Sequence, residues 1–206
     1  MKLNKHWIFL GFLATGALVG CSGDKSARRG EGAEGGPRPE AESIRPERGG
    51  DERTQEADVN GDQKPDVWTY TVAKEAGDGE RVVRKELDVN WDGRVDVTQY
   101  FGPDGAKTRE TLDLDYDGKV DATYLFEGGV NTRRERDING DGRVDSSTYY
   151  ERGALVRKER DTDADGKVDY WEYWEGGQVD RIGEDLDGDG TVDKWTRNPN
   201  NAASEE

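Results

Sequence analysis

The chain has 206 residues, 31% of them apolar and 37% charged, and its 46 acidic against 30 basic side chains give a net charge of −16 at pH 7. This composition excludes a thick hydrophobic core, and a pI near 4.6 argues against nucleic acid as a partner. The single cysteine excludes disulfide bonds within the chain.

Residues 1–20 have the pattern of an export signal, because two lysines precede an uncharged apolar run that is too short to span a membrane. The run ends in Leu18-Val19-Gly20-Cys21, which resembles the lipobox of bacterial lipoproteins. The resemblance implies a cleaved signal peptide, lipidation of Cys21 and anchoring to a bacterial membrane, here expected to be the outer membrane, on its periplasmic or surface face. The alternative is an ordinary secretory signal followed by a buried cysteine.

Cleavage after residue 20 would remove His6, the only histidine, and lipidation would occupy the only thiol. The mature chain would then lack the commonest general base, the commonest transition-metal ligand and a cysteine nucleophile. Its carboxylates recur periodically, whereas a carboxylate-pair glycosidase requires one unlike pair. We therefore expect a protein that is not an enzyme and has no catalytic residues.

Residues 21–57 contain one large apolar side chain, Ile44, among many Gly, Pro, Glu and Arg residues. This composition predicts a disordered tether that follows the lipidated cysteine. The tail, residues 198–206, is predicted to be disordered as well. The domain between them, residues 58–197, is repetitive.

Six copies of a nine-residue pattern occur in this domain, with the consensus carboxylate, apolar, Asp or Asn, any residue, Asp, Gly, basic, Val, Asp. Their first residues are 30, 25, 24, 24 and 24 apart, so they form an array with a nearly fixed period. We number the copies loops 1 to 6 and their residues positions 1 to 9. The loops are 58–66, 88–96, 113–121, 137–145, 161–169 and 185–193.

Each stretch between loops is predicted to form a β-hairpin. After loop 4, residues 146–150 are rich in β-branched and aromatic side chains, Gly153 marks a turn, and residues 155–159 form a second strand. A lone hairpin is unstable, so neighbouring hairpins must pair. We expect an all-β fold of about five to six hairpin repeats in a single-layer antiparallel sheet, with a β-solenoid as the alternative.

Residues two and four positions after each closing Asp share one strand face, because side chains alternate along a strand. This face is predicted to form a thin core. It carries Trp68, Tyr70, Thr98, Tyr100, Thr123, Leu125, Ser147, Tyr149, Trp171, Tyr173 and Trp195. The second strands are basic, and we interpret their side chains as solvated cross-strand partners, with an anion-binding face as the alternative.

The loops are predicted to bind metal, because oxygens at positions 1, 3, 5 and 9 and the carbonyl of position 7 have the spacing that a hard divalent cation requires. Glycine at position 6 of loops 2 to 6 supplies the sharp turn, since it reaches left-handed backbone angles at little cost. Ligation by oxygen alone favours Ca²⁺, with up to six ions. The candidate ligands are Asp58, Asn60, Asp62, Lys64 and Asp66; Asp88, Asn90, Asp92, Arg94 and Asp96; Asp113, Asp115, Asp117, Lys119 and Asp121; Asp137, Asn139, Asp141, Arg143 and Asp145; Asp161, Asp163, Asp165, Lys167 and Asp169; and Asp185, Asp187, Asp189, Thr191 and Asp193. The alternative is a set of Asp-rich turns that bind no metal.

Positions 1 to 9 resemble the calcium loops of EF-hand proteins. The likeness ends at position 12, where that family has a bidentate Glu and this chain has Thr69, Gln99, Tyr124, Thr148, Glu172 and Thr196. The D-x-[DN]-x-D-G-x-x-D strand-loop-strand site of integrin-type propellers is more similar, although a period of 24 residues is too short for a propeller blade. The hairpins resemble short MORN-type β repeats. These resemblances imply calcium binding.

The sequence thus predicts a membrane-anchored calcium-binding repeat lipoprotein with a structural or binding role at the cell envelope. The alternative is a calcium-dependent adhesin or glycan-binding surface protein that would use aromatic residues such as Trp91, Tyr116 and Trp174. Its partner would be an extracellular or cell-wall glycan or protein.

Overall fold

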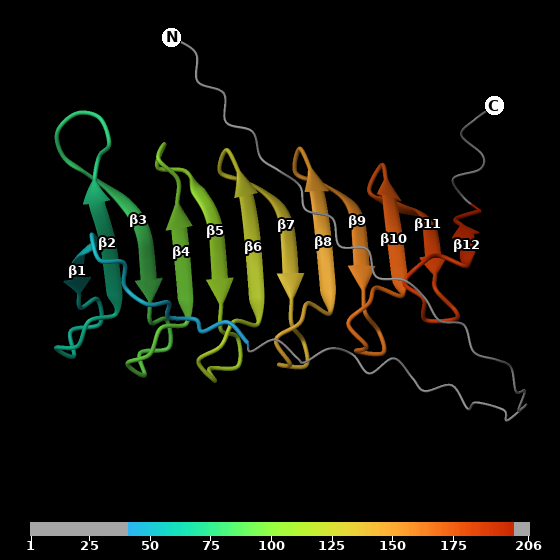
Figure 1. Cartoon of the computed structure of the whole chain (residues 1–206), viewed down its shortest axis with the longest axis horizontal. Helices are drawn as coiled ribbons and strands as arrows, with labels where there is room; N and C mark the ends of the chain where they lie inside the picture. Colours follow the sequence, from blue (N-terminus) through green and yellow to red (C-terminus); the bar gives the residue numbers. More distant parts are fainter. Residues whose placement is uncertain (1–40, 200–206) are drawn as a thin grey trace, which may run out of the picture. The chain divides into compact units, whose positions relative to one another are not determined.

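The structure, a computed structural model, describes residues 41–199. Its twelve strands form one antiparallel sheet in which each strand pairs with its neighbours in sequence (Figure 1). The strands are β1 (Arg53–Ala57), β2 (Val67–Ala73), β3 (Glu80–Leu87), β4 (Val97–Phe101), β5 (Lys107–Leu112), β6 (Ala122–Glu127), β7 (Val130–Arg136), β8 (Ser146–Glu151), β9 (Ala154–Arg160), β10 (Tyr170–Glu175), β11 (Gln178–Glu184) and β12 (Lys194–Arg197). The predicted all-β, single-layer array of hairpins is confirmed, and the sheet is open.

Within residues 41–199, no helix has the length and apolar character needed to cross a membrane. The predicted signal peptide, the lipidation site at Cys21, the tether up to residue 40 and the tail from residue 200 lie outside the described residues.

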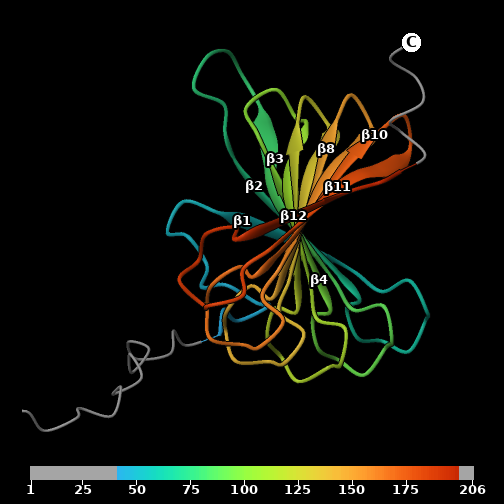
Figure 2. The same cartoon turned by 90° about the vertical axis from the view of Figure 1, so that its right-hand side faces the viewer.

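The six acidic loops lie at one end of the strands and the hairpin turns lie at the other end (Figure 1). Every hairpin has a bulge at the same place, because its second strand carries one extra residue opposite the fourth and fifth residues of its first strand. Bulges increase the right-handed twist of a strand pair. Figure 2 shows the resulting rotation of successive strands.

The face that carries residues two and four positions after each closing Asp has a row in which arginines alternate with tyrosines and, in one repeat, with a leucine. The register pairs Tyr70 with Arg84, Arg84 with Tyr100, and Tyr100 with Arg109. The row continues through Leu125, Arg133, Tyr149, Arg157, Tyr173 and Arg181. The basic second strands therefore place their arginines between the aromatic rings of the first strands.

Residues 41–52, here called the strap, cross this face from the loop between β5 and β6 to the start of β1 (Figure 1). Ile44, with 3% of its surface exposed, packs against Trp68, Tyr70 and Val95. This is the main hydrophobic cluster among the described residues. We call the covered side of the sheet the strap face.

The strap and β1 correct the predicted start of the repeat domain at Asp58. Residues 53–57 form β1 and pair with β2, so residues 41–57 are ordered rather than part of a disordered tether. The physical reason is long-range: the Ile44 carbonyl accepts a hydrogen bond from Thr98 Oγ1 at 2.7 Å. Composition alone does not reveal such a partner.

The opposite face has a second aromatic row, at the fifth position after the closing Asp, where the bulge begins. Phe101, Phe126, Tyr150 and Trp174 lie there. Each ring lies beside a cation, as in the 4.4 Å between Lys107 Nζ and the Phe126 centroid and the 4.8 Å between Lys158 Nζ and the Trp174 centroid. Both faces are therefore lined by ring–cation pairs, which suits a sheet with little apolar material.

Candidate metal-binding loops

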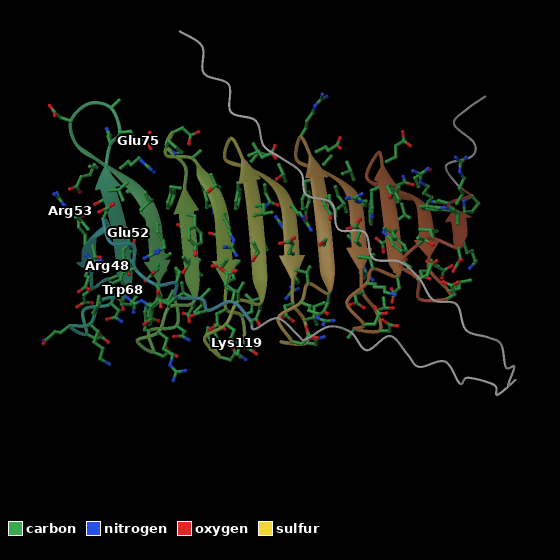
Figure 3. The ribbon with its side chains drawn as sticks, in the orientation of Figure 1. Arg48, Glu52, Arg53, Trp68, Glu75 and Lys119 are labelled. Carbon is green, nitrogen blue, oxygen red and sulfur yellow. The ribbon has the colours of Figure 1, made fainter. Side chains whose placement is uncertain are left out.

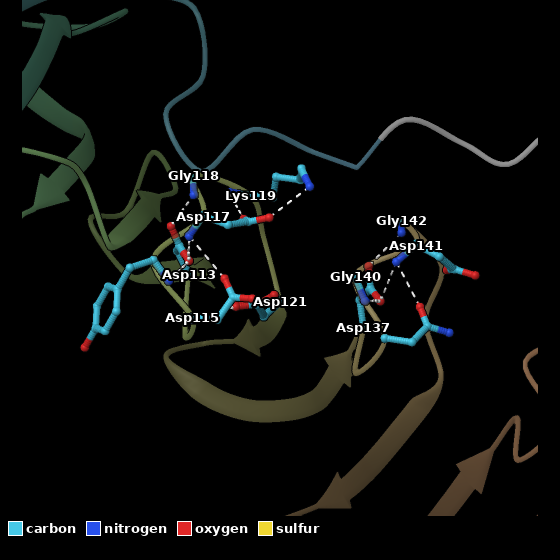
Figure 4. Close-up of polar contacts among 12 residues, drawn as sticks. Asp113, Asp115, Asp117, Gly118, Lys119, Asp121, Asp137, Gly140, Asp141 and Gly142 are labelled. Atoms are coloured by element: carbon cyan, nitrogen blue, oxygen red, sulfur yellow. Dashed lines mark hydrogen bonds and ion pairs between the residues drawn. The ribbon is translucent and has the colours of Figure 1, made fainter.

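The first Asp of each loop accepts hydrogen bonds from backbone N–H groups of the same loop. In loop 3, Asp113 Oδ1 accepts a hydrogen bond from Tyr116 N, and Asp113 Oδ2 accepts one from Gly118 N, both at 2.7 Å (Figure 4). The bond from position 6 to position 1 occurs in all six loops, at 2.6 to 2.8 Å. Aspartate side chains thus replace secondary structure as partners of the loop's N–H groups.

The closing Asp secures the other half of the loop. Asp121 Oδ2 accepts hydrogen bonds from Leu114 N at 2.6 Å and from Asp115 N at 3.2 Å. The carboxylate or amide oxygen of position 3 accepts from the N–H of position 5 in every loop, and position 5 accepts from position 7. Each predicted side-chain ligand is therefore oriented by the backbone of its own loop.

Positions 4 and 6 of every loop have left-handed backbone angles. The predicted left-handed glycine at position 6 is confirmed, as at Gly118 with φ of 91°. Position 4 also has positive φ, and in three loops it is not glycine: Trp91 at 65°, Tyr116 at 67° and Ala164 at 62°. Glycine at position 4 of the other three loops was the sequence signal for this second turn.

Three loops bring carboxylates together tightly enough to hold a metal ion. One ligand oxygen from each of positions 1, 3 and 9 lies within 4.8 Å of the others in the groups Asp113, Asp115, Asp121; Asp161, Asp163, Asp169; and Asp185, Asp187, Asp193. Loops 1, 2 and 4 have Asn60, Asn90 and Asn139 at position 3, so an amide takes the place of the position-3 carboxylate in those loops.

Position 5, a predicted ligand in every loop, does not belong to these groups of three. In loop 3 the Asp117 carboxylate is paired instead with Lys119, whose Nζ lies 2.8 Å from Asp117 Oδ2 (Figure 4). In loops 3, 5 and 6 the structure thus brings together positions 1, 3 and 9, and in loop 3 the carboxylate of position 5 pairs with the basic residue at position 7.

Neighbouring loops are linked. The N–H of the first Asp in one loop donates to the carbonyl of the closing Asp in the loop before it, as from Asp113 to Asp96 at 2.9 Å. Basic side chains at position 7 also reach the next loop, since Lys167 Nζ donates to the Gly188 carbonyl at 2.6 Å. A conformational change in one loop can therefore alter the conformation of the next loop.

The loop carboxylates differ in their electrostatic surroundings. Burial raises the pKa of Asp113 above its ordinary value, and the nearby Asp121 carboxylate adds to the rise. Burial also acts to raise the pKa of Asp185, but hydrogen bonds from the N–H groups of Gly190 and Gly188 outweigh it, and the pKa is lowered. A cation at loop 3 would relieve repulsion that the backbone only partly offsets.

Comparisons with known proteins assign no family to the chain: no family model and no curated protein matches it. The fold is similar to part of the accessory secretory protein 1, 2 and 3 structure from Streptococcus pneumoniae, with 16% identity and a TM-score of 0.35 over 68% of this chain and 22% of that chain. A second similarity is to the glycosylation associate protein (Gap123) complex from Streptococcus agalactiae, with 17% identity and a TM-score of 0.22 over 66% of this chain. The matched region spans 22% of each of these solved chains.

Proposed function

We propose that this chain is a lipid-anchored calcium-binding repeat protein with a structural or binding role at the cell envelope, and not an enzyme. The observation that supports the proposal best is the convergence of Asp113, Asp115 and Asp121, and of the equivalent groups in loops 5 and 6, within 4.8 Å. Carboxylates held this close repel one another strongly unless a cation lies between them.

Calcium fits these loops better than other metals. Residues 41–199 contain neither histidine nor cysteine, so a site built from them offers oxygen alone. Ca²⁺ accepts six to eight oxygen ligands in flexible geometry, whereas Mg²⁺ requires a near-ideal octahedron. Three side-chain oxygens, a backbone carbonyl and water molecules would meet the needs of Ca²⁺.

Bound cations would also stabilise the sheet. Successive loops are two strands apart, or about 10 Å, which is close to the screening length at 0.1 M salt. Each loop has three or four aspartates, so the end of the sheet that carries the loops has a row of negative charge. Since both faces of the single layer contribute little apolar burial, we expect metal binding to supply part of the folding free energy.

Calorimetry tests this proposal. A soluble form of the chain, residues 22–206 without the lipidated Cys21, is freed of divalent ions and titrated with CaCl₂, and the same titration with MgCl₂ serves as the control. We expect saturable heat for Ca²⁺ with at least three sites, and a rise in the melting temperature that EDTA reverses. Absence of heat together with an unchanged melt would refute calcium binding.

The membrane anchor requires a separate test, since residues 1–40 lie outside the described structure. The full chain is expressed in a bacterium fed an alkyne analogue of palmitate. We expect Cys21 to carry the label and the protein to fractionate with membranes. The Cys21→Ser variant is expected to lose both properties. Equal labelling of the variant would contradict the lipidation proposal.

One observation favours the second candidate function, a calcium-dependent glycan binder. Trp91 and Tyr116 are 60% and 46% exposed at position 4, where left-handed angles disfavour any side chain. A variant with glycine at both positions is expected to keep its calcium stoichiometry and to lose retention on cell-wall polysaccharide. Polysaccharide binding that is unchanged in this variant, or absent in the parent, would remove this candidate.

A further inference from the structure

One three-residue arrangement occurs twice on the strap face with nearly the same geometry. In the first copy, the Arg84 guanidinium carbon lies 4.0 Å from the centroid of Tyr70, and Arg84 Nε lies 3.1 Å from Glu86 Oε1. The Tyr70 hydroxyl donates to Glu86 Oε2 at 2.8 Å. Arginine, tyrosine and glutamate thus fix one another.

The second copy lies three repeats further along the sheet. The Arg157 guanidinium carbon lies 4.0 Å from the centroid of Tyr149, and Arg157 Nε lies 3.2 Å from Glu159 Oε1. The Tyr149 hydroxyl donates to Glu159 Oε2 at 2.7 Å. The register places Tyr173 beside Arg157, as it places Tyr100 beside Arg84.

The first copy binds a further carboxylate, which comes from the strap. Arg84 Nη2 donates to Glu52 Oε2 at 2.9 Å, and Gly49 N donates to the same oxygen at 3.1 Å. The Arg84 side chain is only 6% exposed. Figure 3 shows Glu52 at the β1 end of the sheet, with Arg48 and Trp68. Pairing of Arg84 with Glu86 therefore does not prevent a second carboxylate from binding.

No segment among the described residues covers the second copy. Within residues 41–199, no segment crosses the strap face over β8, β9 and β10 (Figure 1). A shallow cavity of about 350 Å³ lies there, lined by Thr132, Tyr149, Arg157 and Tyr173 among others, with Glu151 at the hairpin end. The Arg157 side chain is 35% exposed.

We propose that the Arg157 site binds a carboxylate side chain of an extended acidic peptide segment from a partner protein. The strap is the precedent for this ligand, because an extended acidic segment of this chain occupies the matching arrangement at Arg84. A guanidinium offers several donors in one plane, so it can hold the in-strand Glu159 and an incoming carboxylate at once.

The backbone of the incoming segment has a precedent as well. The strap pairs with loop 3, where Ile44 N donates to the Gly118 carbonyl at 3.1 Å and Val120 N donates to the Glu42 carbonyl at 2.9 Å. Three repeats on, loop 6 has Gly190 and Val192 at the corresponding positions.

The apolar part of the ligand must differ from the strap. Ser147 and Trp171 occupy the positions that Trp68 and Thr98 hold around Ile44. The common element of the two sites is therefore the carboxylate held by arginine. This inference does not depend on calcium, since no loop carboxylate takes part.

Fluorescence anisotropy tests the proposal with the mature chain and a labelled peptide of the strap sequence, AESIRPERGGDE. The chain's own strap occupies Arg84 at a high effective concentration, so the added peptide reports on the open site. We expect saturable binding in the micromolar to millimolar range that weakens about tenfold or more in Arg157→Gln. The matched control is Arg160→Gln, on the same strand but the opposite face, which is expected to bind within about twofold of the parent.

A change in the peptide keeps the test valid if Arg157→Gln disturbs folding. The unaltered protein is titrated with a peptide whose last residue, equivalent to Glu52, is Gln. We expect about tenfold weaker binding than for the acidic peptide. Equal affinity for the two peptides, equal affinity of the two arginine variants, or no binding at about 1 mM peptide would each overturn the proposal.

Discussion

The Glu86 carboxylate lies 3.0 Å from the Nε atom of Arg45, and this ion pair joins the strap to the sheet. Glu86 is fully buried, and the Arg45 guanidinium also stacks over Trp68 at 4.6 Å. A carboxylate so deeply buried is tolerated only when cations and donors surround it. Arg45, Arg84 and the Tyr70 hydroxyl provide that environment.

Removing this carboxylate is expected to be costly. Glu86→Ala would leave Arg84 buried without its in-strand partner, and we expect a loss of about 3–5 kcal/mol in the free energy of unfolding. The control Glu56→Ala, at an exposed position of β1, should change it by no more than about 0.5 kcal/mol. Urea denaturation followed by tryptophan fluorescence measures both. Similar midpoints for the two variants would argue against a structural role of the Glu86 cluster.

The strap should detach when its apolar anchor is shortened. Ile44→Ala removes the centre of the hydrophobic cluster and is expected to cost about 2–5 kcal/mol. Hydrogen exchange should then be faster at Ile44 N and Val120 N, which bond across the strap and loop 3. Ile138→Ala, in loop 4 with an exposed side chain, is the size-matched control and should leave both measurements unchanged.

Backbone strain in the loops can be tested by adding a side chain at one left-handed position and by removing a side chain at another. Gly190 has φ of 89°, and a Cβ added there would meet only Lys167 Cδ, at 3.6 Å, so Gly190→Ala should cost about 1–2 kcal/mol through the backbone alone. Ala164→Gly, at φ of 62°, removes the same kind of strain and should be neutral or stabilising. Thermal unfolding of both variants measures the effect, and destabilisation by Ala164→Gly would contradict this interpretation.

Removing one carboxylate from a loop should weaken calcium binding more than removing one from a hairpin turn. Asp121→Asn removes a carboxylate from the group with Asp113 and Asp115, and we expect calcium to bind loop 3 about tenfold more weakly. Asp104→Asn makes the same charge change in a hairpin turn, where Asp104 Oδ1 accepts a hydrogen bond from Ala106 N. Calorimetry should give parent-like binding for this control. Equal weakening would indicate a general charge effect rather than a site.

Alkaline pH should destabilise the sheet. Burial and the hydrogen bond to Glu159 raise the pKa of Tyr149 above its ordinary value of 10. The folded state therefore holds the phenolic proton more tightly than the unfolded state, so the contribution to stability is complete below pH 10 and is lost as the pH rises through the folded pKa. Urea midpoints from about pH 9 to 11 should fall less steeply for Tyr149→Phe than for the parent. Parallel slopes would contradict the assignment.

The sequence by itself determined the hairpin array and the turns of the loops. Both depend on contacts between residues close in the chain: the alternation of side chains in a strand, the glycine at position 6, and aspartates that accept hydrogen bonds from N–H groups two to seven residues away. The period of about 24 residues then repeats the same loop and hairpin along the chain. Strand order and register follow because each hairpin pairs with the next.

Only the tertiary structure decided which atoms meet over longer distances. Ile44 and Thr98 are 54 residues apart, and nothing in the composition of the tether marks the strap as ordered. The second aromatic row follows from the alternation of side chains along each first strand, but only the pairing of the strands shows which cation meets each ring, as Lys107 meets Phe126 and Lys158 meets Trp174. The groups of carboxylates in loops 3, 5 and 6 likewise contain positions 1, 3 and 9 and not position 5, and in loop 3 the position-5 carboxylate, Asp117, is paired with Lys119. Local hydrogen bonding sets the conformation of each loop and hairpin, whereas burial and ion pairing across the sheet decide what covers it.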